Sequence, residues 1–393
     1  MSSSDFIPFA LPDIGDAEIE AVTTAMRSGW LTTGRVARAF EEEFVAALEP
    51  DRHGPTTYEA IAVNSATSGL HLCLEALGVT HGAEVLVPTW TFTATAEVVR
   101  YLGATPVLVD VDPHTLNIDL EAAAAAVTER TVAIMPVHFA GLPVPREELA
   151  AFAATHGLKV VEDAAHSHPI DSSGVPIGLG ASDAVVFSFY ATKTMTTGEG
   201  GMVVTSDPNL ARRMRMMRLH GISRDVFDRY TSTSPSWHYE VVAPGFKYNL
   251  TDLAAAIGRV QLSRSQVMKD KRTAIADRYD AAFAGLPVEL PARPHRDDSE
   301  HAWHLYVLRL GKDAAITRDE FIASMAEQGV GTSVHFIPLH KHPVWAQLRG
   351  PHAKALPVAD REFERVVSLP IFSAMSTSQV DRVIAAVLAI LGR

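Results

Sequence analysis

The sequence has a single cysteine, no long apolar run and no surplus of positive charge. Because Cys73 has no second cysteine to pair with, an internal disulfide is excluded, which suits a reducing cytoplasm. The chain has no stretch of about 18 apolar residues and no N-terminal apolar segment behind basic residues, so we expect neither a membrane span nor secretion. The net charge of −12 argues against a nucleic-acid surface, so an anionic ligand must meet cations that are gathered locally.

The chain does have enough length and apolar residues for a large core. Its 393 residues suggest two or three domains of ordinary size. From Ala60 onward, short apolar runs alternate with helical patterns, and such repeated strand–helix–strand units indicate an α/β fold with helices on both faces of a mainly parallel sheet. The seven predicted strands are Ala60–Val63, Glu84–Val87, Pro106–Val109, Val132–Pro136, Leu158–Glu162, Ala184–Phe187 and Met202–Thr205.

The pattern changes in the C-terminal third. Thr251 caps a helical pattern that reaches about Leu286, and a proline-rich stretch follows it. Beyond that stretch we predict a strand at 304–310, a helix at 318–328, a strand at 331–336 and a terminal helix at 378–391. We therefore expect a large domain over residues 1–250 and a smaller α+β domain over 251–393, linked by the long helix.

Lys193 is the most informative residue for function. It follows the apolar strand 184–189 and precedes the glycine-rich turn 198–201. A lysine held still and partly desolvated at such a place has a lowered pKa and can form an imine. A solvated surface lysine is the ordinary alternative, so the prediction depends on further features around the same sheet edge.

A carboxylate, Asp163, closes the strand 158–162. In parallel sheets, ligands bind beyond the carboxyl ends of strands, where both Asp163 and Lys193 are expected. A lysine that holds an aldehyde and an acid that keeps a pyridine nitrogen protonated are what pyridoxal phosphate (PLP) requires. The pair therefore predicts a PLP site.

Other residues near strand ends suit the same cofactor. Ser65, Ala66 and Thr67 open a helix and could cradle a phosphate, although an ordinary N-cap explains them equally well. Ser188 could donate to that phosphate. Trp90 could stack on the cofactor ring or could simply pack in the core. His166 could contact the phenolic oxygen of the cofactor, with His168 as a competitor.

Two other enzyme classes fit the sequence less well. A nicotinamide-dependent oxidoreductase would open its first strand–helix unit with G-x-G-x-x-G, but residues 64–69 read Asn-Ser-Ala-Thr-Ser-Gly. A metal hydrolase could draw on 17 histidines, but His335, His340 and His342 form no recognised ligand spacing with carboxylates, so we expect no metal. A non-catalytic regulator with the PLP fold would be favoured by loss of Lys193 or Asp163, and both are present.

The chain resembles the DegT/StrS-type PLP-dependent sugar aminotransferases of fold type I, the aspartate aminotransferase-like superfamily. The resemblance covers essentially the whole chain and rests on ordered motifs: Ser28–Gly34, Ser65–Leu70, Glu162–His166, Phe189–Gly201, Gly245–Asp252, His301–Leu305 and Gly331–Phe336. Some members carry histidine in place of the lysine and dehydrate their substrates, whereas this chain retains Lys193. His166 stands where many members have glutamine.

The resemblance implies a role for each matching residue. Lys193 would bind the cofactor aldehyde and later shuttle a proton, and Asp163 would bind the pyridinium nitrogen. Trp90 would stack on the ring and His166 would lie at its phenolic side. The phosphate would be held by Ala66, Thr67 and Ser188, and by Asn249 of a neighbouring subunit, which makes the active unit a homodimer.

The same resemblance suggests the substrate. The implied reaction is transamination of a nucleotide-linked 4-keto sugar with L-glutamate as the amino donor. The alanine-rich composition, which is typical of GC-rich genomes, favours a 6-deoxy sugar. Amination at C3 of a 3-keto sugar, or of a cyclitol ketone, stays open because the same machinery serves all these ketones. His335 and Thr33 are expected near the substrate, and Arg229 and Lys247 are candidate cations for the nucleotide diphosphate.

Overall fold

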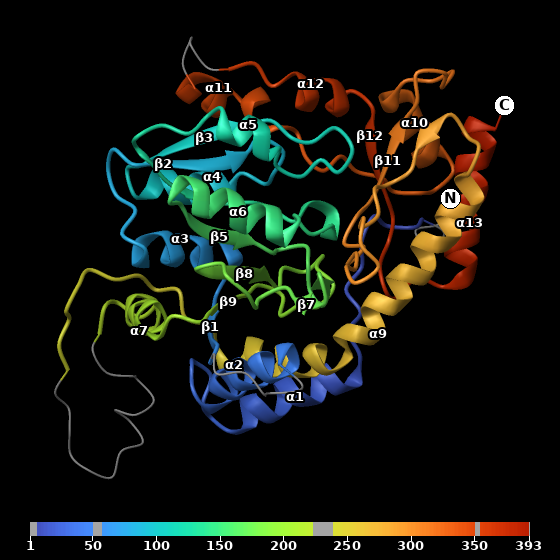
Figure 1. The fold of residues 1–393 in the computed structure, drawn as a ribbon. Coiled ribbons are helices and arrows are strands. Elements are labelled where there is room, and N and C mark those ends of the chain that lie inside the picture. Colours follow the sequence, from blue (N-terminus) through green and yellow to red (C-terminus); the bar gives the residue numbers. More distant parts are fainter. Residues whose placement is uncertain (1–5, 50–56, 223–238, 350–353, 393) are drawn as a thin grey trace.

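The computed structural model describes residues 6–49, 57–222, 239–349 and 354–392 (Figure 1). Its α-helices are α1 (Asp16–Arg27), α2 (Arg35–Leu48), α3 (Ala66–Ala76), α4 (Ala94–Tyr101), α5 (Leu120–Ala124), α6 (Arg146–His156), α7 (Pro208–Met217), α9 (Asp252–Phe283), α10 (Arg318–Glu327), α11 (Pro343–Arg349), α12 (Pro357–Phe363) and α13 (Thr377–Leu391). Two 3₁₀ turns, η1 (Phe139–Gly141) and η2 (Leu339–Lys341), lie between them.

The strands form one large sheet and two small ones. They are β1 (Glu59–Val63), β2 (Glu84–Pro88), β3 (Thr105–Val109), β4 (Thr131–Ile134), β5 (Lys159–Asp163), β6 (Asp171–Ser172), β7 (Val175–Pro176), β8 (Ala184–Ser188), β9 (Gly201–Thr205), β10 (Val288–Glu289), β11 (Tyr306–Leu310) and β12 (Val366–Leu369). The large sheet has the order β1-β9-β8-β5-β4-β2-β3, and only β9 runs antiparallel to its neighbours. Its seven strands are the seven predicted ones, so the mainly parallel α/β fold is confirmed.

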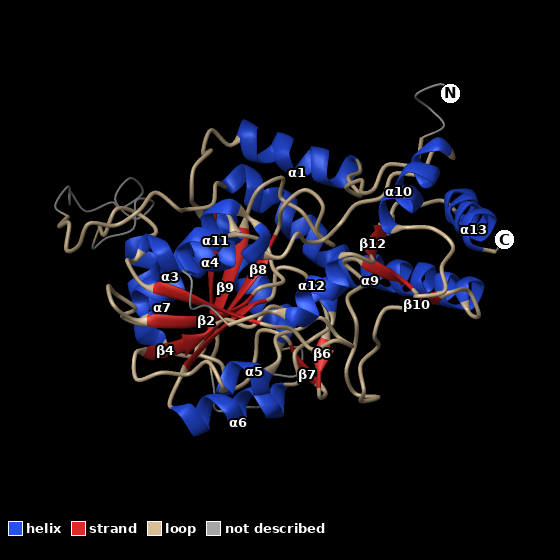
Figure 2. Ribbon diagram, turned by 90° about the horizontal axis from the view of Figure 1, so that it is seen from above, coloured by secondary structure: helices blue, strands red, loops and turns tan. Residues whose placement is uncertain are grey.

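Helices cover both faces of this sheet because side chains alternate along each strand. On β1, Ile61 and Val63 pack towards α3 and α7, whereas Ala60 and Ala62 pack towards α2 and α9. Further along the sheet, α5 and α6 cover Leu86, Ile134 and Val160. Figure 2 shows α4 and α6 on opposite sides of the sheet. The three-layer arrangement leaves the strand ends, rather than the faces, open for a ligand.

The C-terminal region has its own core. The antiparallel sheet β10-β11-β12 packs with the second half of α9, with α10 and with α13 around Tyr279, Phe283 and Phe321. Ile7, near the start of the chain, joins this core and bridges to Val330. In Figure 1 the long helix α9 runs from beside α1 and α2 up to α13. The domain boundary between residues 250 and 251 stays a prediction.

The predicted strand at 331–336 is wrong. Only Ser333 pairs with a strand residue, Ser368 of β12, through bonds of 3.2 and 2.7 Å. Two residues later the chain has turned, because the carbonyl of His335 accepts a hydrogen bond from the indole of Trp90 at 3.0 Å. The backbone at His335 thus bonds to Trp90, beyond β2 of the large sheet, although the ring of His335 still contacts Ser368 of β12 at 3.1 Å. No helix within the described residues is long and apolar enough to cross a membrane.

Candidate active site

A cavity of about 510 Å³ lies beyond the carboxyl ends of β1, β5 and β8. Asp163 and Ser188 are the last residues of β5 and β8, and Ala66 opens the helix that follows β1. Seven of the predicted site residues line this one cavity: Ala66, Thr67, Asp163, His166, Ser188, Lys193 and His335. The parallel strands thus bring together residues that lie up to 269 positions apart in sequence (335 − 66).

The start of α3 forms one end of the cavity. Ser65 is the N-cap, and its hydroxyl accepts the backbone N–H of Ser68 at 3.1 Å. The first N–H groups of a helix have no intrahelical acceptor and favour an anion. The neighbouring strand passes very close, since a Cβ on Gly201 would lie 2.8 Å from the nitrogen of Ala66. Glycine at position 201 therefore lets β9 lie against this helix start.

Asp163 is fixed by two donors. Its Oδ2 accepts a hydrogen bond from the hydroxyl of Thr95 at 2.9 Å, and its Oδ1 accepts one from the N–H of Ala165 at 3.1 Å. Burial raises the pKa of Asp163, whereas these hydrogen bonds and the charge of Lys193 act in the opposite direction. A cation that faced this buried carboxylate would offset the cost of its burial.

Lys193 lies on a loop that is closed by backbone hydrogen bonds. Its own N–H donates to the carbonyl of Tyr190 at 2.9 Å, and the N–H of Thr197 donates to Phe189 at 3.0 Å. The side chain is half-buried because it faces the cavity. Surrounding protein atoms still desolvate the ammonium, so burial lowers the pKa of Lys193 to about 8, although Asp163 acts to raise it. Much of the amine is thus neutral near pH 8.

Three histidines complete the cavity wall: His166, His304 and His335. Burial first, and the charge of Lys193 second, lower the pKa of His335 to about 4. The same two causes lower the pKa of His166 well below its ordinary value. All three rings are therefore neutral at physiological pH, and Lys193 is the cation nearest to Asp163 among the described cavity residues.

Trp90 is wholly buried, at 0% exposure, and does not line the cavity. Its ring packs edge-on against Phe139 and leaves no open face for a cofactor ring, so core packing accounts for this residue. Two positions on, Phe92 is 60% exposed and does line the cavity. The expectation that Trp90 stacks on the cofactor is corrected accordingly, because the segment after β2 presents Phe92 to the cavity instead.

Asn249 and Thr33 contact each other outside the cavity that contains Lys193. The amide of Asn249 donates to the hydroxyl of Thr33 at 2.6 Å, and that hydroxyl donates to the carbonyl of Leu250. Lys247 is exposed, and its carbonyl accepts a hydrogen bond from Asn64 at 3.2 Å. Arg229 lies outside the described residues. The cavity of one chain thus contains seven of the predicted site residues, whereas Asn249, Thr33 and Lys247 lie outside it.

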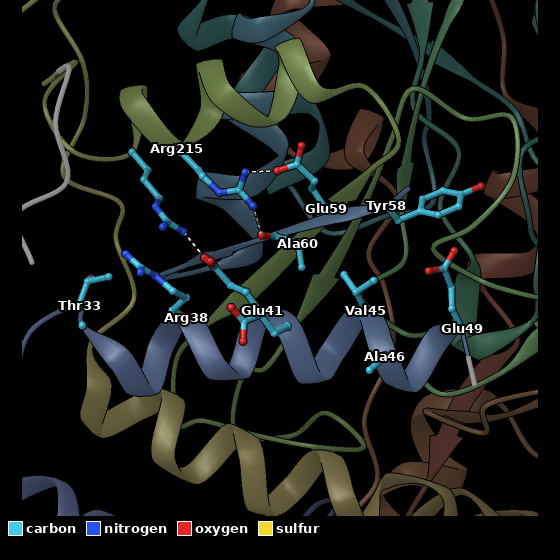
Figure 3. A pocket seen from close by; sticks show the side chains of 13 residues that line it. Thr33, Arg38, Glu41, Val45, Ala46, Glu49, Tyr58, Glu59, Ala60 and Arg215 are labelled. Carbon is cyan, nitrogen blue, oxygen red and sulfur yellow. Dashed lines mark hydrogen bonds and ion pairs between the residues drawn. The ribbon is translucent and has the colours of Figure 1, made fainter. Parts of the chain in front are cut away.

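Thr33 lines a second cavity of about 520 Å³ between α2 and α7 (Figure 3). Arg215 there contacts Glu59 and donates to the carbonyl of Ala60 at 3.0 Å. Arg218 pairs with Glu41. These two arginines already have carboxylate partners, so this cavity is a poorer place for an anionic ligand than the start of α3.

The residues around Lys193 fit PLP. The helix start suits its phosphate, the carboxylate of Asp163 suits a protonated ring nitrogen, and the amine of Lys193 suits its aldehyde. Nδ1 of His166 is buried without a hydrogen-bond partner, so a polar group is lacking beside that ring. The described residues contain no group of three or more potential ligands that could hold a metal ion.

Sequence reasoning missed three residues of this site: Thr95, Phe92 and His304. Thr95 is a small polar residue in the first turn of a helix that follows a strand, which is a weak signal for contact with a neighbouring strand end. Phe92 could have been found only by knowing how the loop after β2 turns. His304 follows Trp303, whose φ of +50° no sequence pattern predicts.

The lowered pKa of Lys193 gives a test on the cofactor-free protein. Because its folded pKa of about 8 lies below the ordinary 10.5, the neutral amine forms as the pH rises through 8. Reductive methylation of Lys193, followed by peptide mass analysis, should therefore rise with a midpoint near pH 8. In Asp163→Asn the midpoint should fall below that of the wild type, because the carboxylate raises the pKa of Lys193. A wild-type midpoint near 10.5 would contradict the described environment.

Known proteins share this fold and sequence. Residues 12–388 match the model of the DegT/DnrJ/EryC1/StrS aminotransferase family. The spore coat polysaccharide biosynthesis protein SpsC of Bacillus subtilis is 45% identical over 384 residues, which cover 97% of this chain and 96% of SpsC. Spr1654 of Streptococcus pneumoniae, in its PMP form, superposes with a TM-score of 0.89 at 32% identity and covers 98% of both chains. DesV of S. venezuelae superposes with a TM-score of 0.84 at 33% identity, covering 97% of this chain and 98% of its own.

These matches run through the whole chain and include structures in both PLP and PMP forms. The cavity has the lysine, the acid and the phosphate cradle that such a cofactor needs. The chain therefore belongs to the DegT/DnrJ/EryC1/StrS aminotransferase family and is a PLP-dependent sugar aminotransferase.

Proposed function

We propose that the enzyme transfers an amino group from L-glutamate to C4 of a nucleotide-linked 4-keto sugar, with a 6-deoxy sugar as the preferred substrate. The observation that carries this proposal is the amine of Lys193, whose pKa is lowered to about 8, in one cavity with the buried carboxylate of Asp163. The relative SpsC is a polysaccharide biosynthesis protein, which supports a saccharide acceptor.

The proposed cofactor contacts follow from the cavity wall. The N–H groups of Ala66 and Thr67, together with the hydroxyl of Ser188, would hold the phosphate at the start of α3. Asp163 would hold the proton on the ring nitrogen, and His166 would lie at the phenolic oxygen. We assign the stacking contact to Phe92 in place of Trp90, because Phe92 has the accessible ring.

When bound, PLP supplies an aldehyde that takes up amines and a ring that accepts an electron pair. The protein moves the protons. Lys193, once its amine is free and neutral, takes the proton from Cα of the amino donor, and it later delivers a proton to the sugar carbon that receives the amino group. The carboxylate of Asp163 would hold the ring nitrogen in its protonated form, which favours uptake of the electron pair by the ring. Because His166 and His335 are neutral, they add no positive charge that would lower the pKa of Lys193 below about 8, so the amine remains basic enough to take up a proton.

We propose a homodimer as the active unit, with Asn249 serving the cavity of the neighbouring subunit. This fits the position of Asn249, which contacts Thr33 and does not line the cavity of its own chain. Thr33, Lys247 and Arg229 would then approach the nucleotide of the neighbouring subunit, and His335 would meet the sugar within its own chain. The single cysteine, buried and free, supports a cytoplasmic location.

A panel of half-reactions tests the substrate proposal. The protein would first be converted with L-glutamate, which should yield one equivalent of 2-oxoglutarate per site. It would then be mixed with separate UDP-, dTDP- and GDP-linked 4-keto and 3-keto sugars, and the amino sugar followed by mass spectrometry. We expect conversion of a 4-keto sugar nucleotide, since one site serves both half-reactions. Lys193→Ala should be inactive, and Lys159→Ala, which removes an exposed lysine paired with Asp183, should retain activity.

Each other outcome of the panel has a defined meaning. Conversion of 3-keto sugars alone would replace the C4 assignment with C3 amination. If no sugar nucleotide is converted, a cyclitol ketone would be added to the panel, and its conversion would replace the assignment with cyclitol amination. Failure to form 2-oxoglutarate from L-glutamate, or the corresponding 2-oxo acid from any other amino acid, would favour a non-catalytic regulator with the same fold.

Mixed dimers test whether Asn249 acts across the subunit interface. Lys193→Ala and Asn249→Ala would be purified separately, each with low activity, and then mixed after mild dissociation. If Asn249 serves the neighbouring subunit, each mixed dimer has one intact site, and random pairing of equal amounts restores about a quarter of wild-type activity. If Asn249 serves its own subunit, no mixed dimer has an intact site and activity stays at the level of the separate variants.

A further inference from the structure

His304 lines the cavity that contains Lys193, but the reaction as described gives it no role. It lies just before β11, in a segment that joins the C-terminal region to the cavity. Its side chain is 7% exposed, and its Nδ1 is buried without a hydrogen-bond partner. A buried nitrogen without a partner is costly, so its presence beside a reactive lysine calls for a reason.

The main contact of His304 is the ring of His166. The two ring centroids lie 4.2 Å apart, with an interplanar angle of 34°. Phe336 at 5.9 Å and Phe139 at 6.4 Å complete the surroundings of His166. Since Nδ1 of His166 also has no hydrogen-bond partner, ring packing rather than hydrogen bonding at that atom sets the plane of this imidazole.

Several hydrogen bonds fix the backbone around His304. The buried guanidinium of Arg272 donates to the carbonyls of Trp303 at 3.1 Å, His304 at 3.4 Å and Ile371 at 2.7 Å. The N–H of Leu305 donates to Ala140 at 3.1 Å. Trp303 has a φ of +50°, a conformation that costs energy in a non-glycine residue and persists only where its surroundings enforce it. These contacts fix where the His304 ring meets His166.

Burial first, and the charges around the two rings second, keep both rings neutral. His166 faces Lys193, His335 and His138, and His304 faces Lys193, Arg272 and His335 in addition to His166. A proton on either ring would place a second cation in the cavity beside Lys193. Asp163 is the nearby carboxylate that would face both cations. The contact therefore joins two neutral imidazoles. Removal of the His304 ring would expose His166 to water, which would raise the pKa of His166 and favour its protonation.

We propose that His304 is a positioning residue that fixes the ring plane and the neutral state of His166. This proposal rests on the proposed function in one respect, namely that His166 lies at the phenolic oxygen of PLP. Its partner in this task is Arg272, whose guanidinium donates to the backbone carbonyls of Trp303 and His304.

The first test uses the cofactor-free protein with isotope-labelled histidine and NMR, with His166 assigned from His166→Gln. In the wild type, the ring protons of His166 should be shifted upfield by the ring of His304. In His304→Leu this shift should disappear and His166 should titrate at higher pH than in the wild type. His304→Phe keeps a ring without nitrogens, so His166 should stay close to the wild type. His71→Leu is the matched control, since His71 is also buried and packs on an aromatic ring, Phe246, at 4.7 Å.

The second readout is PLP affinity, measured by fluorescence titration of the cofactor-free variants. His304→Leu should weaken PLP binding about two- to tenfold, the range expected for loss of one aromatic contact, and His304→Phe should bind as the wild type does. A merely structural role would lower the Tm in His304→Leu and His71→Leu alike without moving the His166 signals. An unshifted His166 in the wild type, or an unchanged His166 in a folded His304→Leu, overturns the proposal.

The two readouts separate this proposal from the proposed function. If His304→Leu changes His166 in the cofactor-free protein while PLP affinity and the absorbance of bound PLP stay as in the wild type, His304 does position His166. In that case the assignment of His166 to the cofactor fails.

Discussion

The structure depends on placing an amine and a carboxylate together where water is scarce. Lys193 and Asp163 would each be ordinary charged groups at a protein surface. In the cavity, burial disfavours both charges, so the lysine pKa falls to about 8 and the aspartate pKa rises. In the proposed function, bound PLP would offset this cost, because its carbonyl would pair with the amine and its ring nitrogen with the acid. The reactivity of the site and its affinity for PLP therefore have the same physical origin.

The fold provides this environment through the ends of its strands. Two neighbouring parallel strands, β5 and β8, deliver Asp163 and the loop of Lys193 to one edge, and the helix after β1 adds an anion site. Helices on both faces exclude water from the sheet, and the segment around His304 and His335 closes the remaining side from the C-terminal region. A ligand in the cavity thus contacts both parts of the chain, so binding should restrict their relative motion.

The sequence predicted the features that depend on local pattern. The seven strands were recognisable as short apolar runs, and residues at their ends, such as Asp163 and Lys193, could be assigned to one edge without knowing the strand order. Trp90 and Phe92 were not distinguishable, because which of them faces the cavity depends on the turn that the chain makes after β2. The segment 331–336 has the composition of a strand, but only Ser333 pairs with β12, and the carbonyl of His335 bonds to the distant Trp90 instead. The position of His304 depends on the positive φ at Trp303 and on hydrogen bonds from the distant Arg272. Neither feature can be predicted from the local sequence.

The most direct measurement of the central claim is the site of covalent attachment of PLP. The PLP-loaded protein would be reduced with borohydride, digested and mapped by mass spectrometry. In the wild type we expect the cofactor mass on the peptide that contains Lys193. In Asp163→Asn, which should retain PLP more weakly, we expect that modified peptide to be absent. Attachment at any other lysine, with Lys193 unmodified, would contradict the account.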